Sequence, residues 1–126
     1  MNIRPVHLVL DTSAIVAYAK TIDVGETIEE VRGNHGEFAL PVACLAEAAH
    51  LMPTDVLDLL VGNKSAILVG LASDEWRALA AMRTLLGRLD VAAAFAAAEA
   101  HACDILTAEP DLYKPLGDDP PIISIA

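Results

Sequence analysis

The side chains of this sequence best placed to do chemistry are carboxylates. Five of them lie just after predicted strands or near the starts of predicted helices: Asp11, Glu47, Asp90, Glu109 and Asp111. Carboxylates that meet in one place repel one another, so their meeting requires bound protons or cations. Hard oxygen ligands without neighbouring Cys or His clusters favour Mg²⁺ or Mn²⁺. Such a cation would hold phosphate and activate water for in-line attack on a phosphodiester.

Each acid also has an ordinary structural role open to it. Asp11 and Asp90 stand where an aspartate often caps a helix N-terminus, and Glu109 and Asp111 could be solvated turn residues. Glu47 is different, because alanines and a leucine flank it and no Lys or Arg lies three or four positions away. It therefore lacks the usual partner for an ion pair along a helix.

Apolar runs alternate with helical stretches along the whole chain. The predicted strands are VHLVL (6–10), EFALP (37–41), SAILVGL (65–71), DILT (104–107) and IISI (122–125). The predicted helices span 12–19, 23–34, 42–52, 53–62, 73–86 and 91–102, with a turn or short helix at EPDLY (109–113). Strands rich in Val, Ile and Leu, separated by helices, are typical of a parallel sheet covered on both faces. We therefore predict a single domain over residues 1–126, a three-layer α/β/α sandwich with a central parallel sheet.

The predicted sheet indicates where the acids would meet. Ligands of an open parallel sheet bind beyond the carboxyl ends of its strands. Asp11 lies at one such end and Glu109 at another. We expect the segments that carry the other acids to converge there too. Thr12 or Ser13 can cap the first helix, which would leave Asp11 free for a metal.

Composition narrows the possible partners and location. The 126 residues carry 18 acids against 8 bases, and this net charge of −10 argues against binding of polyanions by bulk electrostatics. Bound divalent cations would reverse the local charge, and a basic partner protein would also suit this surface. Cys44 and Cys103 have no metal-type spacing and are typical of buried thiols in a reducing cytoplasm. Without a signal peptide or a spanning apolar run, we expect a cytoplasmic protein with no membrane contact.

Other phosphate-handling α/β folds lack their signature residues here. A receiver domain needs an acid pair after its first strand and a lysine after a late strand, but VLDTS has one acid and DILTAE has no lysine. A haloacid-dehalogenase phosphatase needs a second Asp two residues after the first, where this chain has Ser13. Neither a Walker-type glycine loop nor a G-x-S-x-G elbow is present. These comparisons favour a metal-dependent nuclease.

Three segments occur in an order and spacing that are specific together: VLDTSA, LPVACLAE and LDVAAAFAAAEAHACDILTAEPDLY. With them the chain resembles a PIN domain, and in particular the VapC-type toxins of bacterial toxin–antitoxin pairs. The similarity runs from the first predicted strand to DILTAEPDLY. It implies a ribonuclease that depends on Mg²⁺ or Mn²⁺, a small antitoxin protein as partner, and a homodimer.

The resemblance also implies a role for each site residue. The principal cation would be bound by three acids, Asp11, Glu47 and Asp90. Glu109 would complete the site, with Asp111 in reserve, since Thr107-Ala108-Glu109 stands where the family usually has T-x-D. Water, phosphate or a carboxylate would be oriented by the hydroxyl groups of Thr12, Ser13 and Thr107. This chain departs from the family pattern in having Glu109 for the commoner aspartate and Ala108 for a frequent basic residue.

The expected function is cleavage of RNA phosphodiesters by metal-activated water, leaving a 5′-phosphate and a 3′-hydroxyl, by the toxin of a toxin–antitoxin pair. Two alternatives stay open: a PIN-like protein-interaction module with little or no catalysis, and a Mg²⁺-dependent phosphatase on the same sheet. Contacts to RNA are poorly marked. The positions of Arg77, Arg83 and Arg88 are typical of a solvated helix face. We expect Trp76 to lie in the core and Tyr113 to pack the last turn.

Overall fold

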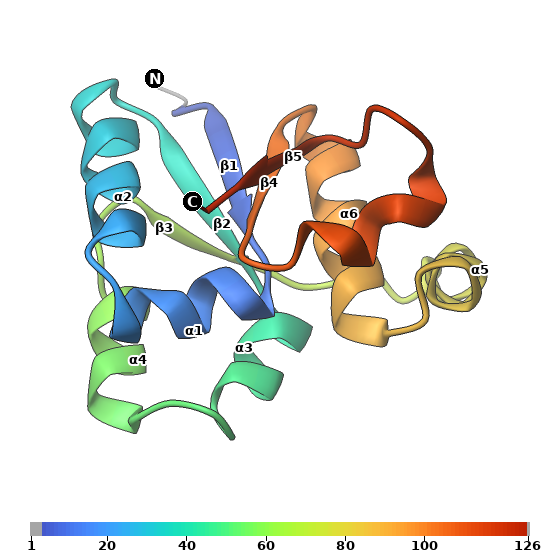
Figure 1. Cartoon of the computed structure of the whole chain (residues 1–126), viewed down its shortest axis with the longest axis horizontal. Helices are drawn as coiled ribbons and strands as arrows, with labels where there is room; N and C mark the ends of the chain where they lie inside the picture. The colour runs from blue at the N-terminus through green and yellow to red at the C-terminus, as the bar shows by residue number, and fades with distance from the viewer. Residues whose placement is uncertain (1–3, 126) are drawn as a thin grey trace.

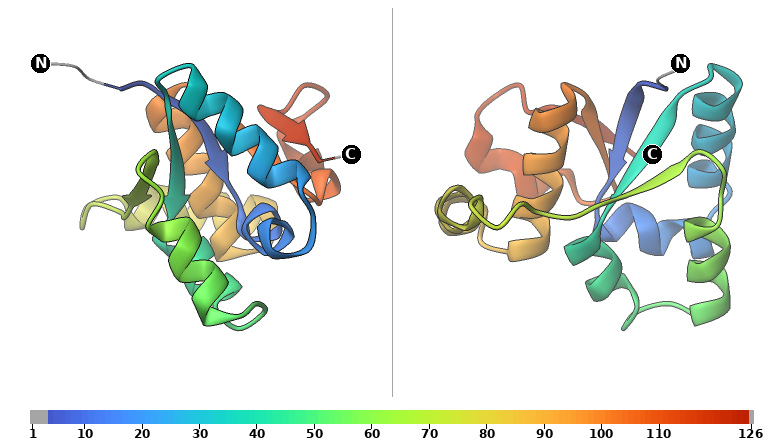
Figure 2. Two further views of the ribbon diagram at one scale, coloured as in Figure 1. Left: turned by 90° about the vertical axis from the view of Figure 1, so that its left-hand side faces the viewer. Right: turned by 180° about the vertical axis from the view of Figure 1, so that it is seen from behind.

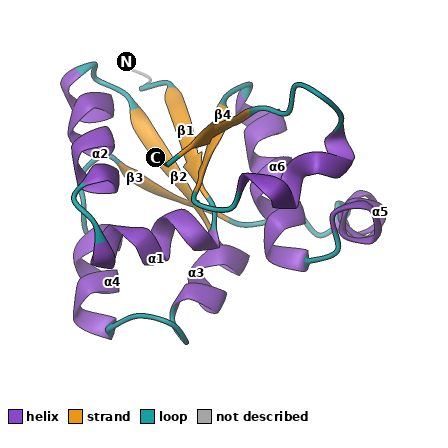
Figure 3. Ribbon diagram, viewed as in Figure 1, coloured by secondary structure: helices purple, strands orange, loops and turns teal. Residues whose placement is uncertain are grey.

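A central sheet of five parallel strands organises the protein (Figure 3). The structure, a computed structural model, describes residues 4–125. The strands are β1 (Val6–Leu10), β2 (Glu37–Pro41), β3 (Ala66–Val69), β4 (Asp104–Thr107) and β5 (Ile122–Ser124). Their order across the sheet is β3-β2-β1-β4-β5, and every neighbouring pair is parallel.

Helices cover both faces of the sheet, which confirms the predicted three-layer α/β/α sandwich. They are α1 (Thr12–Lys20), α2 (Asp23–Gly33), α3 (Val42–Ala48), α4 (Thr54–Val61), α5 (Trp76–Leu86), α6 (Leu89–His101) and the 3₁₀ helix η1 (Pro110–Leu116). Figures 1 and 2 show α1, α2 and α4 on one side of the sheet and α5 and α6 on the other. Helix α3 lies at the carboxyl edge, where it contacts both α1 and α6. Within residues 4–125, no helix has both the length and the apolar character needed to cross a bilayer.

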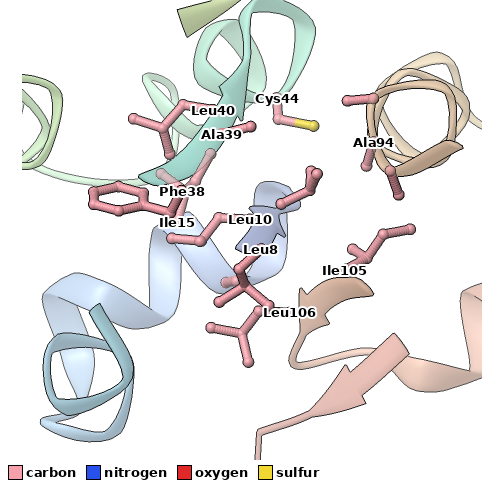
Figure 4. Close-up of a cluster of buried hydrophobic side chains, with 14 of the residues drawn as sticks. Leu8, Leu10, Ile15, Phe38, Ala39, Leu40, Cys44, Ala94, Ile105 and Leu106 are labelled. Atoms are coloured by element: carbon pink, nitrogen blue, oxygen red, sulfur yellow. The ribbon is translucent and has the colours of Figure 1, made fainter. Parts of the chain in front are cut away.

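The core joins aliphatic side chains of the strands to small side chains of the helices. In Figure 4, Leu10 of β1 lies close to Ile15 of α1 and Phe38 of β2, and all three are fully buried. On the other side of the sheet the Cys44 side chain points toward α6, near Ala94. Buried alanines let α6 lie close against the strands, so the start of that helix is fixed relative to the ends of β1 and β4.

The strand order creates a switch point between β1 and β4. From β1 the chain moves outward to β2 and β3, and it then crosses back through α5 and α6 to form β4 on the other side of β1. At such a point the connections leave in opposite directions and open a crevice beyond the carboxyl ends of the two strands. The backbone N–H of Asp11 donates to the Leu106 carbonyl at 3.3 Å, which ties the two strand ends together.

The observed elements agree with the sequence-based prediction in type and order and differ mainly at their ends. Helix α5 begins at Trp76 rather than at residue 73, because the preceding residues form a turn in which the Glu75 N–H bonds to the Ala72 carbonyl at 3.0 Å. Helix α6 begins at Leu89, two residues before its predicted start. The prediction that Trp76 lies in the core is wrong. Its side chain is 60% exposed and stacks under the Arg77 guanidinium, 4.5 Å from the ring centroid.

Candidate active site at the β1–β4 switch point

Asp11 is the first residue after β1, and it caps α1. Its Oδ1 accepts hydrogen bonds from the Ala14 N–H (2.9 Å) and the Ser13 hydroxyl (2.6 Å), and its Oδ2 accepts one from the Tyr113 hydroxyl (2.8 Å). The expectation that Thr12 or Ser13 would provide the cap is wrong, because both already belong to the helix while Asp11 has the extended backbone of an N-cap. A carboxylate has about four acceptor positions. Asp11 can therefore cap the helix and still bind one further group.

Asp90 lies in the first turn of α6, and only 5% of it is exposed. Its Oδ2 accepts hydrogen bonds from the Thr12 hydroxyl (2.6 Å) and from Nη2 of Arg88 (2.7 Å). Its Oδ1 accepts a third from Nε of Arg88 (3.1 Å). The Cys44 thiol, whose pKa burial raises to about 12, stays protonated and donates to the Asp90 carbonyl at 3.2 Å. Asp90 is thus anchored to the start of α1 through Thr12 and to α3 through Cys44.

The turn between α5 and α6 places Arg88. Gly87 ends α5 with a φ of 88°, a left-handed conformation that glycine adopts without strain. Arg88 follows with an extended backbone as the N-cap of α6. From there two nitrogens of its guanidinium donate hydrogen bonds to the Asp90 carboxylate, and the third, Nη1, lies 3.6 Å from Oε2 of Glu109. The prediction of a solvated helix face is therefore wrong for Arg88, because two carboxylates attract its side chain into the site.

This ion pair alters the titration of both partners. Burial raises the pKa of the Asp90 carboxyl, but the hydrogen bonds from Arg88 and Thr12 and the positive charge of Arg88 outweigh it. The net pKa of Asp90 therefore lies below its ordinary value. The hydrogen bond to Asp90 raises the pKa of Arg88 in return. Asp90 is consequently a buried carboxylate that stays ionised at neutral pH.

The end of β4 closes the opposite side of the site. The hydroxyl oxygens of Ser13 and Thr107 lie 3.2 Å apart. The Ser13 oxygen accepts the Ala108 N–H (2.9 Å), and the Thr107 oxygen accepts the Glu109 N–H (3.0 Å). Because Ser13 also donates to Asp11, these two hydroxyl groups hold the backbone after β4 against the end of β1. The Glu109 side chain, 55% exposed, stands at the rim of the site.

Tyr113 and Arg88 are site residues that the sequence did not reveal. Tyr113 is fully buried on η1, and burial together with the nearby charge of Asp11 raises its pKa, so it remains a protonated donor to that carboxylate. No local pattern marks it, since its partner lies 102 positions away. Arg88 did carry a signal. A cation at a helix N-terminus opposes the helix dipole, so an arginine two residues before Asp90 is favoured there only when an acid lies nearby to offset that repulsion.

The site opens into a pocket of about 460 Å³, here named the carboxylate pocket. Its charged lining consists of Asp11, Asp90, Glu109, Arg88 and Lys20. Six of the predicted site residues line it or hydrogen-bond to its lining: Asp11, Thr12, Ser13, Asp90, Thr107 and Glu109. The chain therefore brings its first strand, its alanine-rich helix and its fourth strand to one place, as the position of the switch point requires.

Glu47 and Asp111 do not line the carboxylate pocket. Glu47 is exposed on α3, the helix that packs against α1 and α6 beside the pocket. Asp111 is exposed on η1, where its carboxylate lies 3.4 Å from the Lys114 ammonium. Within residues 4–125, no three His, Cys, Asp or Glu side chains are arranged to share a metal ion.

The donor set of the pocket fits a hard divalent cation. Asp11, Asp90 and Glu109 offer only oxygen ligands, which is the chemistry of Mg²⁺ and Mn²⁺ sites. Asp11 and Asp90 each accept three hydrogen bonds, so each retains about one acceptor position. Three of those six hydrogen bonds come from the neutral hydroxyl groups of Ser13, Tyr113 and Thr12, which fix the orientation of the two carboxylates, as in the outer shell of metal sites.

Comparison with known proteins supports the fold. No family model matches the chain, and no curated protein matches it. Among solved structures, the crystal structure of PAE2754 from Pyrobaculum aerophilum is similar, with a TM-score of 0.59 and 18% sequence identity. The match covers 87% of this chain and 79% of that chain. At this level of identity the similarity concerns the α/β fold alone.

Proposed function

We propose that this protein is an endoribonuclease of the PIN type that depends on Mg²⁺ or Mn²⁺ and serves as the toxin of a toxin–antitoxin pair. One observation carries the proposal. Asp11 and Asp90 come from distant parts of the chain, are only 2% and 5% exposed, and line one pocket at the switch point of the sheet. A buried charge is costly, and such groups cluster where a protein uses them. Helix capping alone does not require two of them in one pocket.

The proposed cation ligands are the carboxylates of Asp11 and Asp90, with Glu109 at the rim. Glu47 on α3 and Asp111 on η1 are the neighbouring acids that could complete the set. A bound cation would supply positive charge at the scissile phosphate and lower the pKa of the attacking water. Lys20, which also lines the pocket, offers an ammonium group to an RNA phosphate.

The surrounding hydroxyl groups would keep these carboxylates oriented during turnover. Tyr113 holds one oxygen of Asp11, and Thr12 holds one oxygen of Asp90. Ser13 links Asp11 to the backbone that carries Glu109. Restricting the rotation of a ligand in this way increases metal affinity. These roles make Tyr113 and Thr12 positioning residues, because each acts through a carboxylate.

The proposed partners are an RNA substrate, a small antitoxin and a second copy of the chain, all in the cytoplasm. The net charge of −10 favours a protein partner with basic segments. Large apolar side chains stand exposed on β3 and in the segment that leads from it into α5, namely Leu68, Leu71 and Trp76. Exposed apolar side chains that form a patch are typical of a surface covered by another protein.

RNA cleavage by the purified protein tests the proposal. We expect cleavage in Mn²⁺ or Mg²⁺ that stops with chelator and leaves 5′-phosphate and 3′-hydroxyl ends. Asp11→Asn and Asp90→Asn should each lower the rate by at least about 100-fold. Asp104→Asn is the matched control, because Asp104 is an exposed acid at the opposite end of β4. Cleavage that resists chelator, or an Asp11→Asn variant as active as the parent, would refute the proposal.

One observation favours a second function, a PIN-like interaction module without catalysis. Arg88 already neutralises Asp90 through two hydrogen bonds, so the pocket is stable without a metal ion. A protein that binds a partner but neither takes up Mn²⁺ nor cleaves RNA would support the module. Hydrolysis of small phosphate esters without RNA cleavage would instead support a phosphatase.

A further inference from the structure

Arg88 and Asp90 form an ion pair in which one side chain is exposed and the other is buried. The Asp90 side chain is 6% exposed and is also fixed by Thr12, whereas the Arg88 side chain is 44% exposed. The guanidinium contacts the carboxylate as a fork, with Nη2 at 2.7 Å from Oδ2 and Nε at 3.1 Å from Oδ1. The Asp90 carboxylate is therefore a fixed part of the protein interior, whereas the Arg88 guanidinium has access to water.

The guanidinium also contacts two of the proposed cation ligands, Asp90 and Glu109. Its Nη1 lies 3.6 Å from Oε2 of Glu109, while the other two nitrogens hold Asp90. Glu109 follows β4, and Asp90 lies in the first turn of α6, so the positive group joins the two sides of the carboxylate pocket. Arg88 provides there one positive charge, where a divalent cation would provide two.

The charge of the lining agrees with an exchange of one cation for another. Three carboxylates and two basic side chains line the pocket: Asp11, Asp90, Glu109, Arg88 and Lys20. With Arg88 in place the lining has a formal charge of three negative against two positive, or −1. When the guanidinium leaves, three negative against one positive gives −2, which one divalent cation neutralises.

The backbone allows Arg88 to leave without unfolding α6. Arg88 is the N-cap residue and has an extended backbone, so rotation of its side chain breaks no hydrogen bond within the helix. The positive end of the helix dipole repels its charge. Among residues 4–125, the polar groups that hold the guanidinium in the pocket are the carboxylates of Asp90 and Glu109.

From these contacts we infer that Arg88 is a tethered competitor of the metal ion. It occupies Asp90 and Glu109 in the metal-free protein and leaves Asp90 when a divalent cation binds. The inference rests on the proposed metal-dependent function of the pocket and adds a regulatory property to it. The metal concentration needed to occupy the site depends partly on the strength of the ion pair between Arg88 and Asp90.

Titration with Mn²⁺, followed by calorimetry on the full chain, tests this inference without any activity assay. We expect Arg88→Ala to bind Mn²⁺ about tenfold more tightly than the parent. Arg88→Lys should fall between the two, because an ammonium group lacks the planar fork that engages both oxygens. Arg83→Ala is the matched control, since it removes the same charge from an exposed position on α5 and should shift the affinity less than about twofold.

The thermal melting point gives a second readout in the same variants. Metal-free Arg88→Ala should melt below the parent, because Asp90 keeps only its bond from Thr12, and saturating Mn²⁺ should raise its melting point more than that of the parent. Equal or weaker Mn²⁺ affinity in folded Arg88→Ala and Arg88→Lys overturns the inference and leaves the metal site standing. If neither parent nor variants bind Mn²⁺, the inference and the proposed metal-dependent function both fail.

Discussion

Two pockets lie at the carboxyl edge of the sheet, and α6 contributes to both. The carboxylate pocket gathers charged and hydroxyl side chains that hydrogen-bond to one another. A second pocket, here named the apolar pocket, has a volume of about 370 Å³. Small and apolar residues dominate its lining, including Pro41, Val42, Leu71, Ala93 and Ala97. One helix therefore presents a carboxylate to the first pocket and alanines to the second.

The difference between the pockets follows from the strand order. The carboxylate pocket lies at the switch point beyond β1 and β4, while the apolar pocket lies beyond β2 and β3, which follow β1 consecutively in the chain. At the switch point the crevice leaves room for polar groups from three distant segments. Beyond β2 and β3, the packing of α3 beside α6 leaves an apolar hollow. The topology of the sheet therefore decides which pocket gathers charged and hydroxyl side chains.

The largest expected effect on the metal-free protein comes from Asp11→Ala. This change removes the cap of α1 and leaves the buried Tyr113 hydroxyl without its acceptor. We expect a loss of roughly 2–4 kcal/mol in the free energy of unfolding, measured in urea. Asp11→Asn is the control, since asparagine caps helices about as well, and it should lose much less. A loss below about 1 kcal/mol for Asp11→Ala would mean that the hydrogen bonds around the carboxylate pocket stabilise the protein no more than the packing around the apolar pocket does.

Arg88→Ala should have an effect that depends on pH. The pKa of Asp90 is lower in the folded protein than its ordinary value of 3.8. Asp90 therefore contributes stability above about pH 4, and that contribution disappears as the pH falls through its folded pKa. We expect the variant to be less stable than the parent by about 1–2 kcal/mol at pH 7. Urea unfolding at several pH values should show this difference shrinking as the pH falls below the ordinary Asp90 pKa of 3.8, and a difference that is constant with pH would contradict the pairing.

Tyr113→Phe should cost about 1 kcal/mol, because it deletes one hydrogen bond to a buried carboxylate and changes little else. Tyr18→Phe provides the comparison, since Tyr18 is half-buried and lies outside the carboxylate pocket. We expect it to change stability by less than about 0.5 kcal/mol. Equal losses for the two variants in urea would show that the Tyr113 hydroxyl adds nothing beyond ordinary burial.

The smallest effects on stability are expected from one substitution made in both pockets. Ala96→Leu fills part of the apolar pocket, and Ala17→Leu fills part of the carboxylate pocket. Each should change the free energy of unfolding by less than about 1 kcal/mol, because both positions are half-buried and adjoin open space. Mn²⁺ affinity and RNA cleavage should fall only for Ala17→Leu. A fall for Ala96→Leu alone would place the chemistry in the other pocket.

Much of the fold could be predicted from sequence, because its strands are short apolar runs with clear ends. β1, β2 and β4 have the predicted bounds, since each is a buried run that ends at a polar residue or a proline. The first residues of the helices were harder to predict. Helix α5 begins three residues late because Asp74 and Glu75 lie in a turn before it, and acidic residues suit a turn as well as a first helical turn.

The sequence predicted where the acids of the candidate site lie, but only some of the side-chain contacts that they make. The placement of Asp11, Asp90 and Glu109 follows from strand ends and a helix start, which the sequence pattern indicates. The partners of these acids depend on side-chain reach across the fold. Arg88 and Tyr113 were missed for that reason, and Glu47, although free of a helical ion pair, is exposed on α3 outside the pocket.

The most direct test of the central claim is a crystal structure of the protein soaked in Mn²⁺, with the ion located by its anomalous signal. We predict a peak in the carboxylate pocket, about 2.1 Å from oxygens of both Asp11 and Asp90, with the Arg88 guanidinium moved off Asp90. An empty pocket at a Mn²⁺ concentration that saturates binding in solution, with Arg88 still joined to both Asp90 oxygens, would contradict it.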